Sequence, residues 1–370
     1  MQLKIATYNL NNLFERAKIM DITSSDTFSE TTREILNDVS KLCTLLEKES
    51  YAGNTGKQII TLLTKYFIQQ PFKKENYFII NQIREKLYSV NRAGQIELKA
   101  KGKSEWLGFV EFTKVKTNGT AVINTARVLN AVAADVVCTV EVDNRIALRN
   151  FNELIKRNFQ KSYPHYMLID GNDDRGIDVG ILSKYEITSI SSHVDDEYTG
   201  EDGKRYKIFS RDCAEYTVQL PHHSTLHVLC NHFKSKGYGT PAVSNERRKR
   251  QAERVAEILK SYDLKTDFVV VAGDFNDTPD SLPLQDLVQL HDLHDVLGSN
   301  KFQGESWTYH VGNQQIDYLL VSKALYQKLS AVGIERRGIF KRGLEHFEEV
   351  DSKITQASDH ACVWATFDLT

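Results

Sequence analysis

The chain has 370 residues, of which 41% are hydrophobic and 26% are charged, and its formal net charge is −2. This is the composition of a globular protein, and the near-neutral balance gives no global sign of nucleic-acid or membrane binding. No apolar run approaches the roughly 18 residues that a membrane-spanning helix needs.

The N-terminus reads MQLKIATYNL, which is a strand pattern with Lys4 inside it rather than a signal peptide. The five cysteines are an odd number without C-x-x-C spacing. We therefore expect reduced thiols and a cytoplasmic protein.

Short runs rich in Val, Ile, Leu and Tyr recur along the chain and predict strands. They lie at residues 3–8, 135–142, 178–183, 213–220, 226–233, 267–273, 316–322 and 361–369. Helical spacing of apolar residues predicts helices over 121–134 and 245–260, the second with Ser244 as a candidate N-cap. This pattern favours an α/β fold in which two packed sheets are flanked by helices.

Residues from about 15 to 120 differ from this pattern, and we interpret them as a mainly helical insert in a single domain spanning 1–370. Residues 31–49 are amphipathic, and residues 57–116 hold twelve Lys or Arg against five Asp or Glu. One interpretation is a basic face, on which the alternating Lys99, Lys101 and Lys103 would share one side of a strand. The alternative is a solvated surface over a small core. The basic run 246–250 leaves the same choice, between a nucleic-acid patch and a solvated helix start.

Polar side chains gather where the predicted strands end or begin. Strands are followed by Asn9, Glu141, His232, Asp274 and Asn276, and others are preceded by Asp178, Asp317, Asp359 and His360. If neighbouring strands run antiparallel, these ends and starts meet at one rim. One Asp after a strand is common in turns, but so many polar strand ends predict a site.

The chemistry of that rim follows from its atoms. Carboxylates and Asn carbonyls without Cys are hard ligands that suit Mg²⁺ or Mn²⁺, with Ca²⁺ as a third option, rather than zinc. Each histidine has a candidate carboxylate partner to fix its tautomer. A hard cation beside an oriented histidine is suited to hydrolysing a phosphate ester.

The same stretches resemble the endonuclease/exonuclease/phosphatase superfamily, which has the DNase I-like fold. The matching motifs occur in the family's order over about residues 1–14 and 121–370, and they read TYNLNNLF, EVDN, RGIDVGILSK, SRDC, NHFKSKG, GDFNDTP, IDYLLVS and SDHACVWA. The resemblance implies a two-sheet sandwich with a metal-dependent phosphoesterase site at one rim.

The resemblance also implies a role for each matching residue. Glu141 corresponds to the principal metal-binding carboxylate, with Asn9, directly or through water, and Asp359 beside the metal. The catalytic group would comprise His360 oriented by Asp317, His232 as general acid with Asp178 as its partner, and the pair Asp274 and Asn276. Phosphate contacts are expected from Arg211, Lys234 and Arg175.

The departure from the family is the insert, because 131 residues separate Asn9 from Glu141. The chain is identified as a bacterial-type member with a long insert after the first strand. We expect a Mg²⁺- or Mn²⁺-dependent phosphodiesterase acting on nucleic acid, as an endonuclease. The alternatives are a phosphatase or phospholipase-type enzyme on a small or lipid phosphate, and a non-catalytic binding member. The sequence indicates no protein partner.

Overall fold

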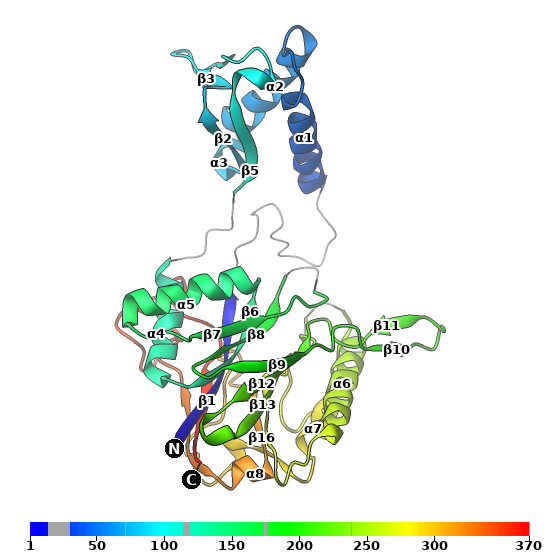
Figure 1. Cartoon of the computed structure of the whole chain (residues 1–370), viewed down its shortest axis with the longest axis vertical. Coiled ribbons are helices and arrows are strands. Elements are labelled where there is room, and N and C mark those ends of the chain that lie inside the picture. The colour runs from blue at the N-terminus through cyan, green and yellow to red at the C-terminus, as the bar shows by residue number, and fades with distance from the viewer. Residues whose placement is uncertain (14–29, 71, 114–118, 174–175, 238, 370) are drawn as a thin grey trace. The chain divides into compact units, whose positions relative to one another are not determined.

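The computed structural model describes residues 1–13, 30–70, 72–113, 119–173, 176–237 and 239–369 (Figure 1). The chain divides into two compact units. The larger unit comprises Met1–Glu15 with Thr117–Thr370, and the smaller comprises Arg16–Lys116.

The larger unit contains two six-stranded sheets. The first has the order β17 (Leu329–Glu335), β18 (Cys362–Asp368), β1 (Gln2–Leu13), β6 (Val136–Val142), β8 (Asp178–Ser183) and β7 (His165–Leu168). The second has the order β15 (Leu293–Asp295), β16 (Asp317–Ser322), β14 (Phe268–Asp274), β13 (Thr225–His232), β12 (Cys213–Gln219) and β9 (Ile187–Ser191). All eight predicted strands are present, and the predicted sandwich is confirmed.

The strands do not all run antiparallel. In each sheet one central pair is parallel, β1 with β6 and β13 with β14. The polar ends still meet, because each parallel pair brings two carboxyl ends together, and antiparallel neighbours add the starts of β16, β8 and β18.

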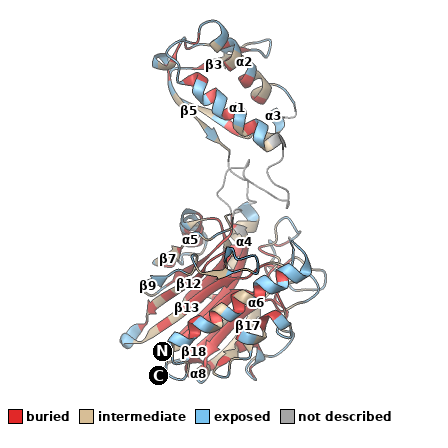
Figure 2. Cartoon of the chain, turned by 90° about the vertical axis from the view of Figure 1, so that its right-hand side faces the viewer, coloured by how far each residue is buried: buried red, intermediate tan, exposed pale blue. Residues whose placement is uncertain are grey.

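Helices cover the outer face of each sheet, which explains why the strands are apolar on both sides. Helices α4 (Gly119–Val132) and α5 (Arg145–Phe159) pack on the first sheet through side chains such as Val128 and Leu148. Helices α6 (Pro241–Ile258) and α7 (Gln285–Val288) pack on the second, through Val255 and Leu287. Figure 2 shows the buried strands and the exposed outer surface of α6.

Helix α6 begins at Pro241, four residues before the predicted start at 245. Its N-cap is Thr240, whose hydroxyl accepts from the Val243 amide, and Pro241 is the first helical residue, where its missing N–H costs nothing. Ser244 therefore lies inside the first turn and is buried. The remaining elements of this unit are the hairpin β10 (Glu197–Thr199) and β11 (Arg205–Lys207), and the short α8 (Lys323–Tyr326).

The smaller unit has a core of its own. Its helices are α1 (Glu30–Leu46), α2 (Asn54–Phe67) and α3 (Phe72–Glu75), and its strand pairs are β2 (Phe78–Arg84) with β5 (Leu107–Phe112) and β3 (Tyr88–Val90) with β4 (Ile96–Leu98). Ile35, Leu42, Ile59, Leu63 and Trp106 form part of its buried centre. The predicted amphipathic segment 31–49 corresponds to α1.

The prediction that Lys99, Lys101 and Lys103 share a strand face is wrong. Strand β4 ends at Leu98, and Lys103 starts a 3₁₀ turn. The chain bends here because its backbone bonds to residues 48–51, and a Cβ on Gly102 would lie only 1.8 Å from the Glu49 carbonyl oxygen. Two of the three ammonium groups are also paired, Lys99 with Glu97 and Lys103 with Glu47.

The basic run 246–250 is mainly a paired helix surface. Arg248 is fully buried, while Arg250 and Lys249 form ion pairs with glutamates on the same helix. The interpretation of this run as a nucleic-acid patch is therefore wrong for Arg248, which is buried. Across the parts of the chain that the structure describes, no helix is both long and apolar enough to cross a bilayer.

Candidate active site

The end of β14 is shaped by a glycine. Gly273 has φ +139°, and a Cβ there would lie 1.8 Å from the Asn231 carbonyl oxygen on the neighbouring strand. Only glycine fits this approach. Beyond it, Asp274 Oδ1 accepts from the Asn276 backbone N–H at 2.8 Å, and Asn276 Nδ2 donates to the Phe233 carbonyl at 3.1 Å. The turn thus fixes both polar side chains.

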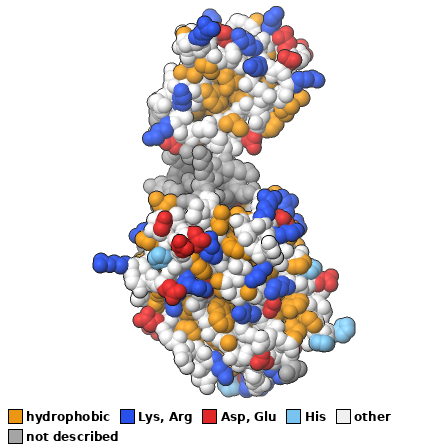
Figure 3. Space-filling view, turned by 90° about the vertical axis from the view of Figure 1, so that its left-hand side faces the viewer, with side chains coloured by type: hydrophobic (Ala, Val, Ile, Leu, Met, Phe, Trp, Pro, Cys, Tyr) orange, Lys and Arg blue, Asp and Glu red, His pale blue; other side chains and the backbone are white. Residues whose placement is uncertain are grey.

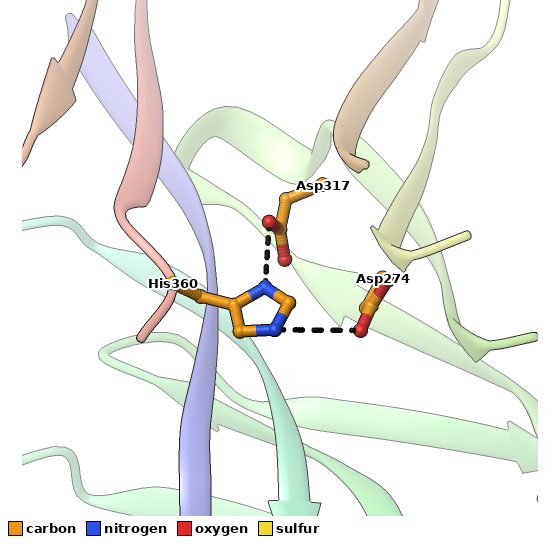
Figure 4. Close-up of side chains that lie close together, drawn as sticks. All are labelled: Asp274, Asp317 and His360. Carbon is orange, nitrogen blue, oxygen red and sulfur yellow. Dashed lines mark hydrogen bonds and ion pairs between the residues drawn. The ribbon is translucent and has the colours of Figure 1, made fainter. Parts of the chain in front are cut away.

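A carboxylate–imidazole pair lies beside Asp274. Asp317, at the start of β16, is directly opposite Asp274 in the sheet register. Its Oδ2 lies 2.8 Å from His360 Nδ1, and His360 Nε2 is 3.9 Å from Asp274 Oδ2 (Figure 4). The ring is therefore held between two buried carboxylates, and its far nitrogen points toward Asp274.

The same oxygen of Asp274 also faces Asn9 and His232. Asn9 Nδ2 donates to Asp274 Oδ2 at 3.3 Å, and His232 Nε2 lies 3.8 Å from that oxygen. All three residues are buried. Asn9 belongs to the first sheet and the other two to the second, so the sandwich closes around this carboxylate.

Burial disfavours the charged form of the His360 ring, but the charge and hydrogen bond of Asp317, together with Asp274 and Asp359, raise its pKa well above the usual range. Burial raises the pKa of Asp274 to about 7; His360 opposes this rise, while Asp317 and Glu141 add to it. The site therefore concentrates negative charge around the His360 ring, which favours its protonated form.

Glu141 occupies a strained position at the edge of this group. The β6–β8 pairing passes from Val140 to Val142, so Glu141 is a bulge residue, and its φ is +63°. Such backbone conformations are costly for non-glycine residues and cluster at functional sites. Burial raises the Glu141 pKa; His360 and a hydrogen bond from Asn9 oppose this, and Asp359 adds to it. Glu141 is therefore within electrostatic reach of the cluster.

Asp359 lies closer to solvent. Its side chain is 32% exposed, and its Oδ1 is 4.0 Å from His360 Nε2. Its backbone carbonyl accepts from the His310 N–H at 3.2 Å. The loop carrying Asp359 is therefore anchored, and the partly exposed carboxylate lies beside the His360 ring.

The donor set fits a hard divalent cation. The described residues include one group of three close ligand atoms, on Asp274, Asp317 and His360, within 4.8 Å of one another. Asp317 gives one oxygen to His360, so this trio is better suited to orienting the imidazole. The raised pKa values of Asp274 and Glu141 show carboxylates that a nearby cation would stabilise. The oxygens of Glu141, Asn9 and Asp359 are the predicted ligands.

Two hydroxyl residues that support the site were missed from the sequence. Ser358 Oγ donates to the Asn9 carbonyl at 2.8 Å and accepts from the His360 N–H at 3.0 Å, which joins two site residues. Thr308 Oγ1 accepts from the backbone N–H groups of Ile316 and Asp317. Ser358 precedes the Asp-His pair directly, so its place in the SDH motif was the available signal.

Three other predicted residues have contacts of their own. Asp178 Oδ1 accepts from the Gly171 N–H at 2.8 Å, and burial raises its pKa to about 7. Its pairing with His232 stays a prediction. Buried Arg211 has Nε 2.9 Å from Asp173 Oδ2, a partner that the sequence did not indicate.

Lys234 Nζ donates to the carbonyls of Ser235 and Gly237 at 2.9 and 2.6 Å. These bonds hold the ammonium at its own loop, and a phosphate contact by Lys234 stays a prediction. Arg175 lies outside the described residues.

The sequence model of the Endonuclease/Exonuclease/phosphatase family matches residues 115–360, two thirds of the chain. The chain belongs to this family. The resemblance seen in the motifs is thereby confirmed, and with it the DNase I-like sandwich of two sheets flanked by helices. Proteins of this superfamily are metal-dependent phosphoesterases, among them nucleases and phosphatases.

Several solved structures are similar to this chain, two of them from proteins of this family. A member from Beutenbergia cavernae is 20% identical over 68% of this chain and 66% of its own, with a TM-score of 0.48. One from Bacteroides thetaiotaomicron is 14% identical over 100% and 99%, with a TM-score of 0.48. A mutant beta toxin from Staphylococcus aureus with bound magnesium ions is 16% identical over 68% and 93%, with a TM-score of 0.43. No curated protein matches the chain.

Proposed function

We propose that the protein is a Mg²⁺- or Mn²⁺-dependent phosphodiesterase that hydrolyses nucleic acid, as an endonuclease. The observation that carries the proposal is the buried group in which His360, held by Asp317, faces Asp274 together with Asn9 and His232. In a phosphoesterase, this group would supply a charged imidazole for the phosphate from His360, a base from Asp274 and an acid from His232.

The phosphate is bound by a positively charged imidazole. The raised pKa of His360 favours its imidazolium form, which suits it to hold a phosphate oxygen rather than to remove a proton from water. Asn9 contributes an NH₂ donor from the opposite sheet. A cation held by Glu141, Asn9 and Asp359 would neutralise phosphate charge.

Asp274 and His232 are the proposed proton carriers. Asp274 has a pKa of about 7, which is suited to accepting the proton of the attacking water at neutral pH. As the new P–O bond forms, the bond from phosphorus to the leaving oxygen breaks, and His232 gives that oxygen a proton. Asn276 holds Asp274 in place through its backbone N–H.

Nucleic acid is the proposed substrate because the insert carries an excess of positive charge. Residues 57–116 hold twelve Lys or Arg against five Asp or Glu. On the face drawn in Figure 3, Lys and Arg side chains of the smaller unit lie around hydrophobic ones. Phosphate backbones attract such surfaces without sequence preference.

A lipid phosphate is the second candidate substrate, and one observation favours it. Strands β2 and β5 expose four large apolar side chains, Ile79, Ile83, Leu107 and Phe109. An exposed apolar face of this kind also suits a membrane surface.

Hydrolysis assays separate these functions. The purified chain is given plasmid DNA, single-stranded RNA, phospholipid vesicles, bis-p-nitrophenyl phosphate and a phosphomonoester, each with Mg²⁺ and with EDTA. We expect cleavage of nucleic acid and of the small diester, both abolished by EDTA. Turnover of lipid or monoester alone would replace the nuclease proposal, and no turnover of any ester would indicate a binding protein.

A further inference from the structure

A pocket with charged, polar and apolar lining residues lies beside the chain segments that carry His232 and Asn276. It has a volume of about 420 Å³, and its lining includes Lys236, Asn245, Arg248, Asp277, Ser281 and Leu282. It lies on the loop that continues directly from Asn276 and on the loop that follows His232. The two segments that end in site residues therefore also form the walls of this pocket.

A buried ion pair makes the inner wall of the pocket rigid. Arg248 is 1% exposed, and its Nε lies 3.0 Å from Asp277 Oδ2. Arg248 Nη1 donates to the Lys234 carbonyl at 2.9 Å, and Nη2 donates to Asn245. The guanidinium thus connects α6 to the loop after His232 and to the loop after Asn276. The inner wall of the pocket is therefore formed before a ligand binds.

The pocket has an excess of one positive charge. Its lining contains two cations, Lys236 and Arg248, and one carboxylate, Asp277. Lys236 is 48% exposed, and its Nζ lies 3.0 Å from Asp277 Oδ1. An incoming phosphate can take this ammonium, because Asp277 keeps Arg248 and the Thr278 N–H as partners.

The rest of the lining suits a nucleoside. Leu282 is 83% exposed at the rim, beside Pro241 and Pro283, and offers an apolar surface. The hydroxyls of Ser244 and Ser281, which also line the pocket, are buried and have no hydrogen-bond partner among the described residues. A volume of this size is in the range of small-molecule sites, roughly 300–1,000 Å³.

We propose that this pocket binds the nucleotide adjacent to the scissile phosphodiester. Its phosphate contacts Lys236, and its sugar and base lie against Leu282 and the prolines. The inference rests on the proposed nuclease function and adds a subsite to it, which requires a substrate longer than the single diester that the site itself needs.

The test compares a long and a short substrate. Steady-state kinetics are measured with an oligonucleotide of about ten residues and with bis-p-nitrophenyl phosphate, for the parent, Lys236→Gln, Lys236→Arg and Leu282→Ala. We expect Lys236→Gln to lose about tenfold more kcat/KM on the oligonucleotide than on the small diester, through KM, the effect of one charge-assisted contact. Leu282→Ala should show the same bias, and Lys236→Arg should restore most of the loss. Lys249→Gln is the matched control, since Lys249 lies on α6 beside Arg248 but does not line the pocket, and its replacement should leave both substrates unchanged.

Several results would overturn the proposed subsite. Equal losses on both substrates would assign Lys236 a structural role and overturn the subsite, as would parent-like kinetics on the oligonucleotide. In both cases cleavage by the parent would leave the nuclease proposal standing. If the parent cleaves no nucleic acid, the nuclease proposal and the subsite that rests on it fail together. A free mononucleotide that inhibits the parent and Lys236→Gln equally would also contradict the subsite.

Discussion

His360 Nδ1 lies 2.8 Å from Asp317 Oδ2, and both side chains are buried at the rim where the two sheets meet. The carboxylate fixes which ring nitrogen faces Asp274 and stabilises the protonated ring. The pair therefore links the second sheet, through β16, to the start of β18 in the first.

Replacing Asp317 by Asn should slow hydrolysis by about 10²–10⁴, the usual scale for acid–base groups, and lower the pKa of His360. Since the imidazolium is the form proposed to bind phosphate, the alkaline limb of kcat/KM should move to lower pH. The measurement is the pH–rate profile on bis-p-nitrophenyl phosphate. Asp295→Asn is a matched control, because Asp295 is a half-buried carboxylate on β15 outside the site. An alkaline limb at the same pH in Asp317→Asn as in the parent would contradict the proposed role of the Asp317–His360 pair.

The fold was predictable because its strands are buried on both faces. Runs such as 267–273 are apolar and short, which is typical of buried strands. A polar residue at the end of such a run is therefore easily recognised as a candidate site residue. Asp274, Asp317 and His360 were found in this way. Asp274 and Asp317 meet through the antiparallel pairing of β14 with β16, as expected. His232 joins them because β13 and β14 are parallel, a direction that the sequence does not give.

Other features depended on tertiary contacts that leave no local pattern. Glu141 is a bulge residue with positive φ, which only the pairing of β6 with β8 reveals. Arg248 sits in a basic run that reads as solvated, yet it is buried against Asp277 from a distant loop. Lys99 and Lys103 alternate as in a strand, but Gly102 lets the chain turn toward residues 48–51.

His232 should show its role through the leaving group. Replacement by Ala should reduce cleavage of a poor leaving group, such as a ribose or deoxyribose oxygen, by about 10²–10⁴. The loss should be much smaller with p-nitrophenolate, which departs without a proton. The comparison of both substrates in His232→Ala is the measurement. Equal losses would assign His232 to phosphate binding instead.

Gly273→Ala should destabilise the protein strongly. A Cβ at Gly273 would overlap the Asn231 carbonyl oxygen, and its φ of +139° is unfavourable for alanine. We expect a loss of roughly 3 kcal/mol or more in the free energy of unfolding, measured with urea. Gly304→Ala separates the two causes, because Gly304 also has positive φ but has open space around it. Equal losses at the two positions would contradict the close approach of β13 and β14.

His193 should make stability depend on pH. Its Nε2 lies 2.6 Å from Glu215 and its Nδ1 3.0 Å from Asp196, and the hydrogen bond to Glu215 raises its pKa against the opposing effect of burial. A raised folded-state pKa gives stability that is full below the unfolded value of about 6.5 and is lost as the pH rises through the folded value. His193→Gln should therefore lose more stability at pH 6 than at pH 9, by urea unfolding. The exposed His291→Gln is the control, and equal losses of His193→Gln at both pH values would contradict this prediction.

The most direct test of the proposed function is the Mg²⁺ dependence of phosphodiester cleavage in Glu141→Gln. Gln keeps the shape of the side chain but removes the charge that a cation needs. The parent and the variant are assayed on plasmid DNA and on bis-p-nitrophenyl phosphate across a Mg²⁺ titration, with thermal unfolding followed in the same buffers. We predict that the parent cleaves both substrates and is stabilised by Mg²⁺, whereas the folded variant does neither. Cleavage near the parent rate by a folded Glu141→Gln protein, with the same Mg²⁺ response, would contradict the assignment of this rim as a metal-dependent phosphodiesterase site.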